Sequence, residues 1–517
     1  MKTSIFVIIV FIILTSCSKQ SNKKEINPLL KSKAMCDVGN NTQLLLDNYV
    51  IEDIREIKRT INKPVKYNGN PIIVTDKPWE SFAIPGSDAS MPISPNTIIY
   101  DEDEHIFKMW GTIFRYVFYD SRKNNGYTYW TVYLTSKDGI HWQKPNLGIV
   151  EFNGSKDNNI VMQGEWWATV GTVLKDKSEP DNLKRYKMLY TDVYGMDVFK
   201  KMSFDELKKR YKKELDEYYK NGKVQSVVCV AYSHDGIHWT PSKDNPVMYT
   251  ESDCMNTVFW DKNINKYVWF MRPNVYAGPW KRRIARTESD DFIHWDFPRT
   301  VLVPDELDPT RFYGMPTFYN SGVYFGLLQV YYDKTEEIEI QLAYSRNSFD
   351  WKRLPTRDIF IGKGAESSFD AKMVFAATPV EVGDELWFYY SGAPTDHTAT
   401  GGIRAVGLAT IKKDRFIARE NIPGKEGKIL TRPFVFKGSE IEINASAERG
   451  DIKAELLTFE GEKIEGFEKE NSIPFNGDSL NALLKWKGKK NLRELKGKIV
   501  RIKFYLTDAK LYSFKVN

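Results

Sequence analysis

A seven-residue motif that recurs along the chain constrains its fold more than any other feature. It occurs at Ser136–Trp142, Ser233–Trp239 and Ser289–Trp295, which share Ser-x-Asp-x-Ile-His-Trp, and more weakly at Ser345–Trp351. A degenerate fifth copy, in which the final tryptophan is replaced, follows residues 406–410. Each copy succeeds an apolar run rich in β-branched and aromatic residues, and Asp-Gly within the motif is typical of a turn. The motif therefore predicts a corner between two β-strands.

Upstream of each corner the pattern predicts a β-hairpin. The five pairs of strands are 96–100 with 106–110, 168–174 with 186–190, 257–260 with 267–271, 316–319 with 323–328, and 377–382 with 386–390. A hairpin, a strand and a corner that opens another strand make four strands, and the 56-residue spacing of the later copies suits one propeller blade. Five such units predict an all-β fold, a five-bladed β-propeller over residues 41–425.

The second unit is longer than the others, because its corner follows the first by 97 residues. Ser203–Glu206 reads as a capping box, and Phe204, Leu207 and Tyr211 begin a helical period of apolar residues among charges. The extra length predicts an amphipathic helix inserted at about residues 200–221. A lid over a site and a plain surface helix explain it equally well.

Beyond residue 425 the corners stop and charged residues alternate with apolar ones. The alternation is clear at 439–444, 452–456 and 500–506. A period of two with one charged face predicts a small β-sandwich, so residues 426–517 are expected to form a separate domain with a supporting or glycan-binding role.

The N-terminus carries a targeting signal. The apolar run Ile5–Leu14 is shorter than the roughly 20 residues of a membrane-spanning helix and fits a signal peptide. It ends in Leu14–Cys17, which resembles the lipobox of bacterial lipoproteins and implies acylation of Cys17. We expect a signal peptide at 1–16, a tether at 17–40, and a cell-envelope protein, periplasmic or cell-surface, that meets the membrane only through its lipid. A secretory peptide cut near Ser16 is the alternative.

Composition and cysteine spacing exclude several classes of protein. A net charge of +6 over 517 residues is far from that of a nucleic-acid binder. Cys36, Cys229 and Cys254 have no close pair, so neither a disulfide framework nor a zinc site is expected, and buried thiols are. Gly-rich phosphate loops, H-E-x-x-H and G-x-S-x-G motifs are missing from the sequence. No cofactor is expected, although a ring of acids in the channel would suit a structural calcium ion.

The corner motif, the five units and the trailing sandwich together resemble the five-bladed β-propeller glycosidases, the superfamily of glycoside hydrolase families 43, 32, 68, 117 and 130. The similarity covers roughly residues 70–425 and matches no single member family. The corner is also similar to the Asp-box of sialidases, where Asp and Ser close the turn and Trp packs between blades. The resemblance implies a glycoside hydrolase in which the corners are structural.

Blade layout predicts where the chemistry lies. The loop that leads into the first strand of a blade and the loop between its second and third strands converge on one face, which we call the mouth. Glycoside hydrolysis needs two carboxyl groups about the scissile bond. Acids recur in these loops, and the catalytic candidates are Asp88, Asp253, Glu366 and Asp370. Each of these candidates also has a structural alternative: it fixes a turn, caps a strand or lies solvated in a loop.

In the resembled superfamily an Asp entering blade one is the nucleophile or base, an Asp in blade two assists, and a Glu in blade three is the acid. By position Asp88 matches the first. The chain departs from the pattern at blade two, which offers Glu165, and at blade three, which offers Asp253 with Glu251 nearby. The acid therefore stays unassigned. Asp101 is discarded, together with Asp261, because both belong to turns on the opposite face.

Other mouth residues are candidates for substrate binding. Trp166 and Trp167 suit stacking on a sugar ring, although blade packing explains them as well. Arg115 lies in one of the mouth loops, Arg272 suits a sulfate or uronate, and His397 suits a hydroxyl, with a plain loop histidine as its alternative.

The sequence therefore favours a hydrolase of polysaccharide-derived oligosaccharides, with carbohydrate as its partner. A phosphorylase is a second hypothesis, weakly favoured by the adjacent Arg282 and Arg283. The third is a non-catalytic glycan-binding lipoprotein, favoured if no two mouth carboxylates approach within roughly 5–10 Å.

Overall fold

A computed structural model describes residues 35–80, 94–120, 124–165, 167–194, 225–248, 252, 255–273, 282–309, 311–397, 404–488 and 491–517. The signal peptide, Cys17, Cys254 and the helical insertion predicted at 200–221 lie outside these ranges. Within them the regular structure consists of strands and four short 3-10 turns, η1 (Pro78–Glu80), η2 (Asn182–Lys184), η3 (Lys469–Asn471) and η4 (Leu492–Leu495). None of these described turns is long and apolar enough to cross a membrane.

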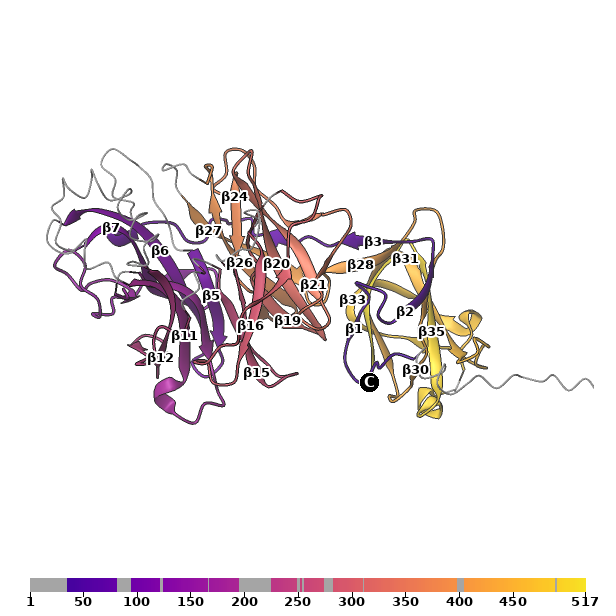
Figure 1. The fold of residues 1–517 in the computed structure, drawn as a ribbon. Coiled ribbons are helices and arrows are strands. Elements are labelled where there is room, and N and C mark those ends of the chain that lie inside the picture. The colour runs from indigo at the N-terminus through magenta and orange to yellow at the C-terminus, as the bar shows by residue number, and fades with distance from the viewer. Residues whose placement is uncertain are drawn as a thin grey trace, which may run out of the picture.

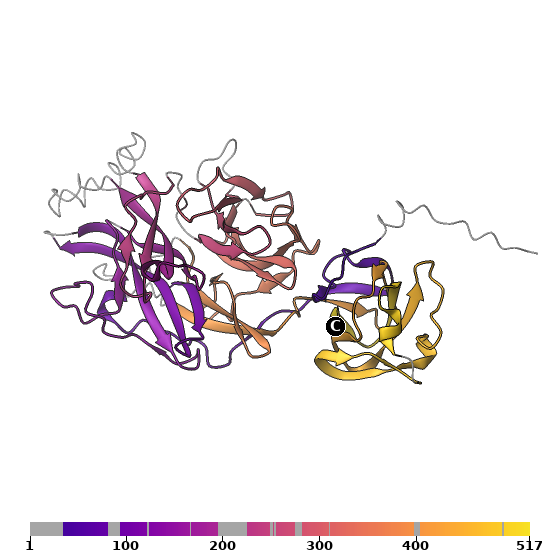
Figure 2. The same ribbon diagram turned by 90° about the horizontal axis from the view of Figure 1, so that it is seen from below.

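Five antiparallel units follow one another along the chain, as predicted (Figures 1 and 2). Blade one has β5 (Ser94–Asp101), β6 (Ile106–Asp120), β7 (Asn124–Ser136), β8 (Trp142–Gln143) and β9 (Ile160–Met162). Blade two has β10 (Thr169–Lys175), β11 (Tyr186–Tyr194), β12 (Gln225–Ser233) and β13 (Thr240–Pro241). Blade three has β14 (Thr257–Asp261), β15 (Lys266–Met271), β16 (Ile284–Ser289) and β17 (Arg299–Leu302).

The last two blades complete the ring. Blade four has β18 (Arg311–Gly314), β19 (Thr317–Asn320), β20 (Val323–Tyr332), β21 (Glu337–Ser345), β22 (Lys352–Arg353) and β23 (Ile359–Ile361). Blade five has β24 (Met373–Ala376), β25 (Val380–Val382), β26 (Glu385–Ala393), β27 (Ala405–Lys412) and, from the N-terminal side, β4 (Val65–Lys66). Lys66 pairs with Ala409, so a strand from the start of the chain closes the fifth blade. This explains the degenerate fifth corner, since the chain after β27 leaves the propeller.

The corners are structural, as the resemblance implied. In the first, Gly139 N–H donates to Ser136 Oγ at 2.9 Å and His141 N–H donates to Asp138 Oδ1 at 2.8 Å. The indole of Trp142 packs edge-on against Tyr389 of blade five, with ring centres 5.7 Å apart. The first corner therefore ties blade one to blade five, the preceding blade around the ring.

Aspartates on the opposite face also join blades. Asp101 accepts a hydrogen bond from Tyr186 of blade two at 2.7 Å, and Asp261 accepts one from Tyr324 of blade four at 2.5 Å. These contacts confirm that both acids belong to inter-blade packing and justify discarding them as catalytic candidates.

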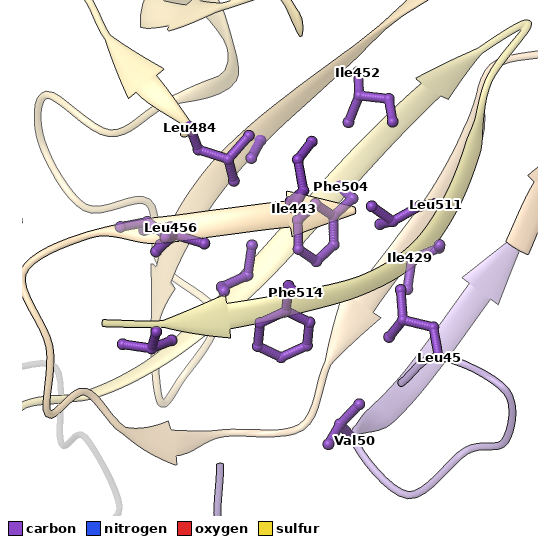
Figure 3. Packing of buried hydrophobic residues seen from close by; sticks show 14 of the residues in the cluster. Leu45, Val50, Ile429, Ile443, Ile452, Leu456, Leu484, Phe504, Leu511 and Phe514 are labelled. Atoms are coloured by element: carbon purple, nitrogen blue, oxygen red, sulfur yellow. The ribbon is translucent and has the colours of Figure 1, made fainter. Parts of the chain in front are cut away.

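A second domain of antiparallel strands packs beside the propeller. Its strands are β1 (Gln43–Leu44), β2 (Ile51–Arg55), β3 (Ile57–Ile61), β28 (Ile417–Asn421), β29 (Gly427–Thr431), β30 (Phe434–Val435), β31 (Ile441–Thr458), β32 (Ser472–Ile473), β33 (Phe475–Leu483), β34 (Lys485–Trp486), β35 (Ile499–Thr507) and β36 (Lys510–Val516). The long β31 pairs with β33 and β36 through its first half and with β35 through its second. The sheet thereby folds over one apolar core, in which Ile443, Phe504 and Phe514 meet (Figure 3).

Strand pairing places the domain boundaries differently from the sequence-based prediction at residues 41 and 425. The segment Gln43–Ile61 belongs to the C-terminal domain, because β1 pairs with β36, β2 with β29 and β3 with β28. Cys36 and Val38, in the predicted tether 17–40, are buried in the same core. The reason is physical: without these strands β28 would have an uncovered edge and the core an open side. Figure 1 shows β3 beside β28 where the two domains meet.

Candidate functional site

In the described part of the mouth, a group of polar side chains surrounds Tyr313 in β18. The guanidinium of Arg272 lies 4.9 Å from the centre of the tyrosine ring, and its Nη1 donates to the Tyr313 carbonyl oxygen at 3.0 Å. The guanidinium of Arg282 lies 5.5 Å from the same ring centre. His397 Nε2 lies 3.1 Å from the Tyr313 hydroxyl oxygen. We call these residues, with Arg404, the Tyr313 cluster.

Topology explains why these residues meet. Arg272 follows β15 and Arg282 precedes β16, so both belong to the loop between the second and third strands of blade three. His397 follows β26 and Arg404 precedes β27, in the corresponding loop of blade five. Tyr313 lies on the first strand of blade four, between them. Three blades thus converge on one point of the mouth, as the propeller layout predicts.

Burial and neighbouring cations set the charge of His397. Burial lowers the pKa of His397 to about 4, and the positive charges of Arg404, Arg282 and Arg272 act in the same direction, against Glu336. The imidazole is therefore neutral near pH 7. Burial also lowers the pKa of Arg404, while the charges of Tyr313 and Tyr129 oppose that shift.

Aromatic rings flank the cluster. Trp167 packs edge-on against Tyr129, with ring centres 5.0 Å apart, and Phe375 packs against Tyr313 at 5.2 Å. The backbone N–H of Trp167 donates to the buried carboxylate of Asp192 at 2.8 Å, and that of Glu165 donates to it at 2.7 Å. Asp192 therefore holds the loop that leads into blade two and positions Trp167 at the mouth.

Of the predicted site residues, the structure brings together Arg272 and His397 and places Trp167 on the same face. Asp88, Asp253 and Trp166 lie outside the described residues. The prediction that Arg115 lies in a mouth loop is wrong, because β6 continues past it to Asp120, and nothing is described of its side chain.

The two blade-five carboxylates have different surroundings. Glu366 is exposed. The Asp370 side chain is 3% exposed and accepts hydrogen bonds from Lys66 at 2.6 Å, Ser368 at 2.6 Å and the Tyr390 hydroxyl at 3.0 Å. Burial would raise the pKa of Asp370, but the bonds from Lys66 and Ser368 hold it below its ordinary value. Asp370 thus binds the closing strand β4, and sequence reasoning missed this ion pair because its partners are distant along the chain.

Other described acids of the mouth loops are also engaged by cations. Asp308 pairs with Arg353 at 2.6 Å, Asp333 with Arg311 at 3.0 Å and Asp396 with Lys372 at 3.4 Å. No cluster of three His, Cys, Asp or Glu side chains suited to a metal ion occurs within the part of the chain that the structure describes. What gathers in the described part of the mouth is therefore cationic and aromatic. Tyr313 and Arg404, which sequence reasoning missed, carry no motif that would have marked them.

Comparison with known proteins gives structural matches only. Neither protein-family models nor curated proteins match the chain. A thermostable family-43 glycoside hydrolase is 13% identical and matches over 65% of this chain and 95% of its own, with a TM-score of 0.41. A β-1,2-mannobiose phosphorylase from Listeria innocua is 13% identical over 67% and 96%, with a TM-score of 0.41. An N-acetylgalactosamine deacetylase from F. plautii is 13% identical over 69% and 96%, with a TM-score of 0.43. Similarity at this level does not distinguish among these reactions.

Proposed function

We propose that this protein is a glycoside hydrolase that cleaves polysaccharide-derived oligosaccharides at the propeller mouth. The observation that carries the proposal is the convergence of blades three, four and five on the Tyr313 cluster, beside the Tyr129–Trp167 pair. Aromatic faces pack against sugar rings, and arginine and neutral imidazole groups hydrogen-bond to their oxygens. This combination of aromatic and polar groups suits a sugar-binding site.

The catalytic pair we propose is Asp88 with Asp253, one acting as acid and the other as nucleophile or base. Asp370 is less suited to either role, because Lys66 holds it as an ionised, buried partner. Glu366, which is exposed, stays a candidate for the acid.

The test uses the full chain in non-ionic detergent and a panel of sulfated, uronate-bearing and neutral oligosaccharides. Asp253→Asn is expected to abolish turnover, while the melting temperature stays nearly unchanged. Asp290→Asn, an exposed aspartate of the same blade, is the matched control and keeps full activity. Full activity of Asp253→Asn removes that residue from the pair, and no turnover of any panel member refutes the hydrolase in favour of a glycan-binding protein.

A phosphorylase is the second candidate, because the arginines of the Tyr313 cluster also suit inorganic phosphate. Turnover that requires phosphate and releases a sugar phosphate would establish it. Turnover in phosphate-free buffer supports the hydrolase.

We also propose that Cys17 is acylated and that the protein is anchored to the cell envelope by this lipid alone. Metabolic labelling with a fatty-acid analogue should mark the wild type and leave Cys17→Ser unmarked. Labelling of both proteins would contradict the anchor.

A further inference from the structure

We propose that the arginines of the Tyr313 cluster form a subsite for an anionic substituent of the sugar, a carboxylate or a sulfate. This inference rests on the proposed function and names the class of substrate that it takes. It begins from charge, because the guanidinium groups of Arg272 and Arg282 lie 4.9 and 5.5 Å from the centre of the Tyr313 ring. The positive charge of Arg404 also acts on His397, which contacts the same tyrosine.

Two arginines of this cluster, Arg282 and Arg404, differ in their described partners from several arginines elsewhere on the propeller. Arg353, Arg311 and Arg286 each have a carboxylate partner within about hydrogen-bond distance, at 2.6, 3.0 and 3.0 Å. Among the described residues, no carboxylate lies within ion-pair distance of Arg282 or Arg404. Within the described residues, Arg282 and Arg404 therefore lie at the mouth with no carboxylate close enough to neutralise them.

Bringing like charges together in a partly dry site costs free energy unless an anion compensates them. Arg282 is only partly exposed, and burial lowers the pKa of Arg404, so water compensates these two charges only in part. An anion that enters the cluster restores the balance. The planar guanidinium group donates two parallel hydrogen bonds to a carboxylate or a sulfate, which a neutral hydroxyl cannot accept in the same way.

Neighbouring groups agree with a substituent on a sugar. His397, neutral near pH 7, hydrogen-bonds to the Tyr313 hydroxyl and adds a polar contact without a further charge. Phe375 and Tyr331 pack on Tyr313 and His397 and give the cluster an apolar wall. The negative charge of Glu336 raises the pKa of His397 and repels other anions. The cluster therefore suits a ligand with a single anionic group. One charged group beside an apolar ring is thus the expected ligand.

The experiment measures binding without turnover. The full chain in non-ionic detergent is titrated calorimetrically with glucuronate, glucose 6-sulfate, glucose and inorganic phosphate. We expect glucuronate or glucose 6-sulfate to bind at least ten-fold more tightly than glucose, and the tighter of the two identifies the substituent. Arg282→Gln and Arg404→Gln are each expected to weaken that binding about 10- to 100-fold, the loss of one charge-assisted hydrogen-bond pair. Arg493→Gln, an exposed arginine of the second domain, removes the same charge and leaves binding unchanged.

Several outcomes would overturn the inference. These are equal binding of glucose and glucuronate, unchanged binding in both cluster variants when their melting temperatures match the wild type, and binding of phosphate with no binding of the charged sugars. Arg282 is only partly buried, so its variant stays informative if Arg404→Gln fails to fold. Binding of a charged sugar without hydrolysis of any panel member keeps the subsite and refutes the hydrolase. Hydrolysis of neutral oligosaccharides alone supports the hydrolase and refutes the anionic subsite.

Discussion

Replacement of Asp370 by asparagine separates a structural role from a catalytic one. Its carboxylate is almost fully buried and joins β24 and β26 of blade five to Lys66 of the closing strand at 2.6 Å. Removal of one partner of a fully buried ion pair costs about 3–5 kcal/mol, and because the Lys66 side chain is 30% exposed we expect a smaller loss of about 2–3 kcal/mol. Tyr390 and Ser368 also lose a charged acceptor, which is included in this figure.

Urea unfolding followed by tryptophan fluorescence measures this loss in the propeller, because all 14 tryptophans except Trp486 lie outside the C-terminal domain. The double variant Lys66→Met/Asp370→Asn should lose about 1–2 kcal/mol less unfolding free energy than the two single variants lose together, because the two residues interact directly. The lowered pKa of Asp370 means that its contribution is complete above the unfolded-state pKa of about 4 and disappears as the pH falls through the lower folded value.

A catalytic Asp370 would behave differently. Asp370→Asn would then abolish turnover and leave the urea midpoint at the wild-type value. An unchanged midpoint refutes the structural reading, whatever happens to activity.

Two further predictions concern the mouth and the corners. Burial lowers the pKa of His397 to about 4, so between pH 6.5 and 4 the unfolded chain binds a proton that the folded chain does not. The free energy of unfolding should therefore decrease as the pH is lowered across this window. The urea midpoint of His397→Gln should decrease less than that of the wild type over this pH range. Curves of midpoint against pH that run parallel for the two proteins would contradict the prediction. Gly139→Ala should be destabilised by about 1 kcal/mol more than Gly154→Ala. Both glycines have a positive φ, so the backbone cost is shared. Only at Gly139 would the new Cβ meet another residue, because it would lie 2.6 Å from the hydroxyl oxygen of Tyr389. Equal unfolding temperatures of the two variants would refute the packing argument.

The blades could be predicted from the sequence because their signals are local. Each corner closes through hydrogen bonds within four residues, as between Ser136 and Gly139, and each hairpin pairs neighbouring strands. Pairings between segments that are far apart in the sequence leave no such pattern. Lys66 and Asp370 are 304 residues apart, and the degenerate fifth corner did not indicate that β4 closes the blade.

The site was predicted in part for the same reason. Arg272 and His397 follow strands that the hydrophobic pattern marks clearly, so their loops could be assigned to the mouth. Sequence cannot show which acids already have partners, and Asp308, Asp333 and Asp370 looked alike before their cations were known. Nor could it show that the charge of Arg404 acts on His397, because that interaction depends on how the strands of blade five fold.

The dependence of the C-terminal domain on the N-terminal strands gives the last prediction. Leu45, Val50 and Ile51 are 0–4% exposed in its core, and full burial of such a side chain contributes roughly 1.5–3 kcal/mol. Their combined loss, about 5–9 kcal/mol, is comparable with the whole stability of a domain, about 5–15 kcal/mol. The loss of β2 and β3 also uncovers the edges of β29 and β28.

A fragment of residues 413–517 is therefore expected to be largely unfolded by circular dichroism and to gain strand structure when a peptide of residues 35–62 is added. A peptide in which Val50 and Ile51 are replaced by serine is the control and should not restore the fold, since it keeps the length but not the apolar contacts. A fragment that unfolds cooperatively without the peptide would show that the C-terminal strands bury a sufficient core alone. In that case the N-terminal strands would serve the junction between the domains, where Arg346 of blade four pairs with Asp47 at 3.0 Å.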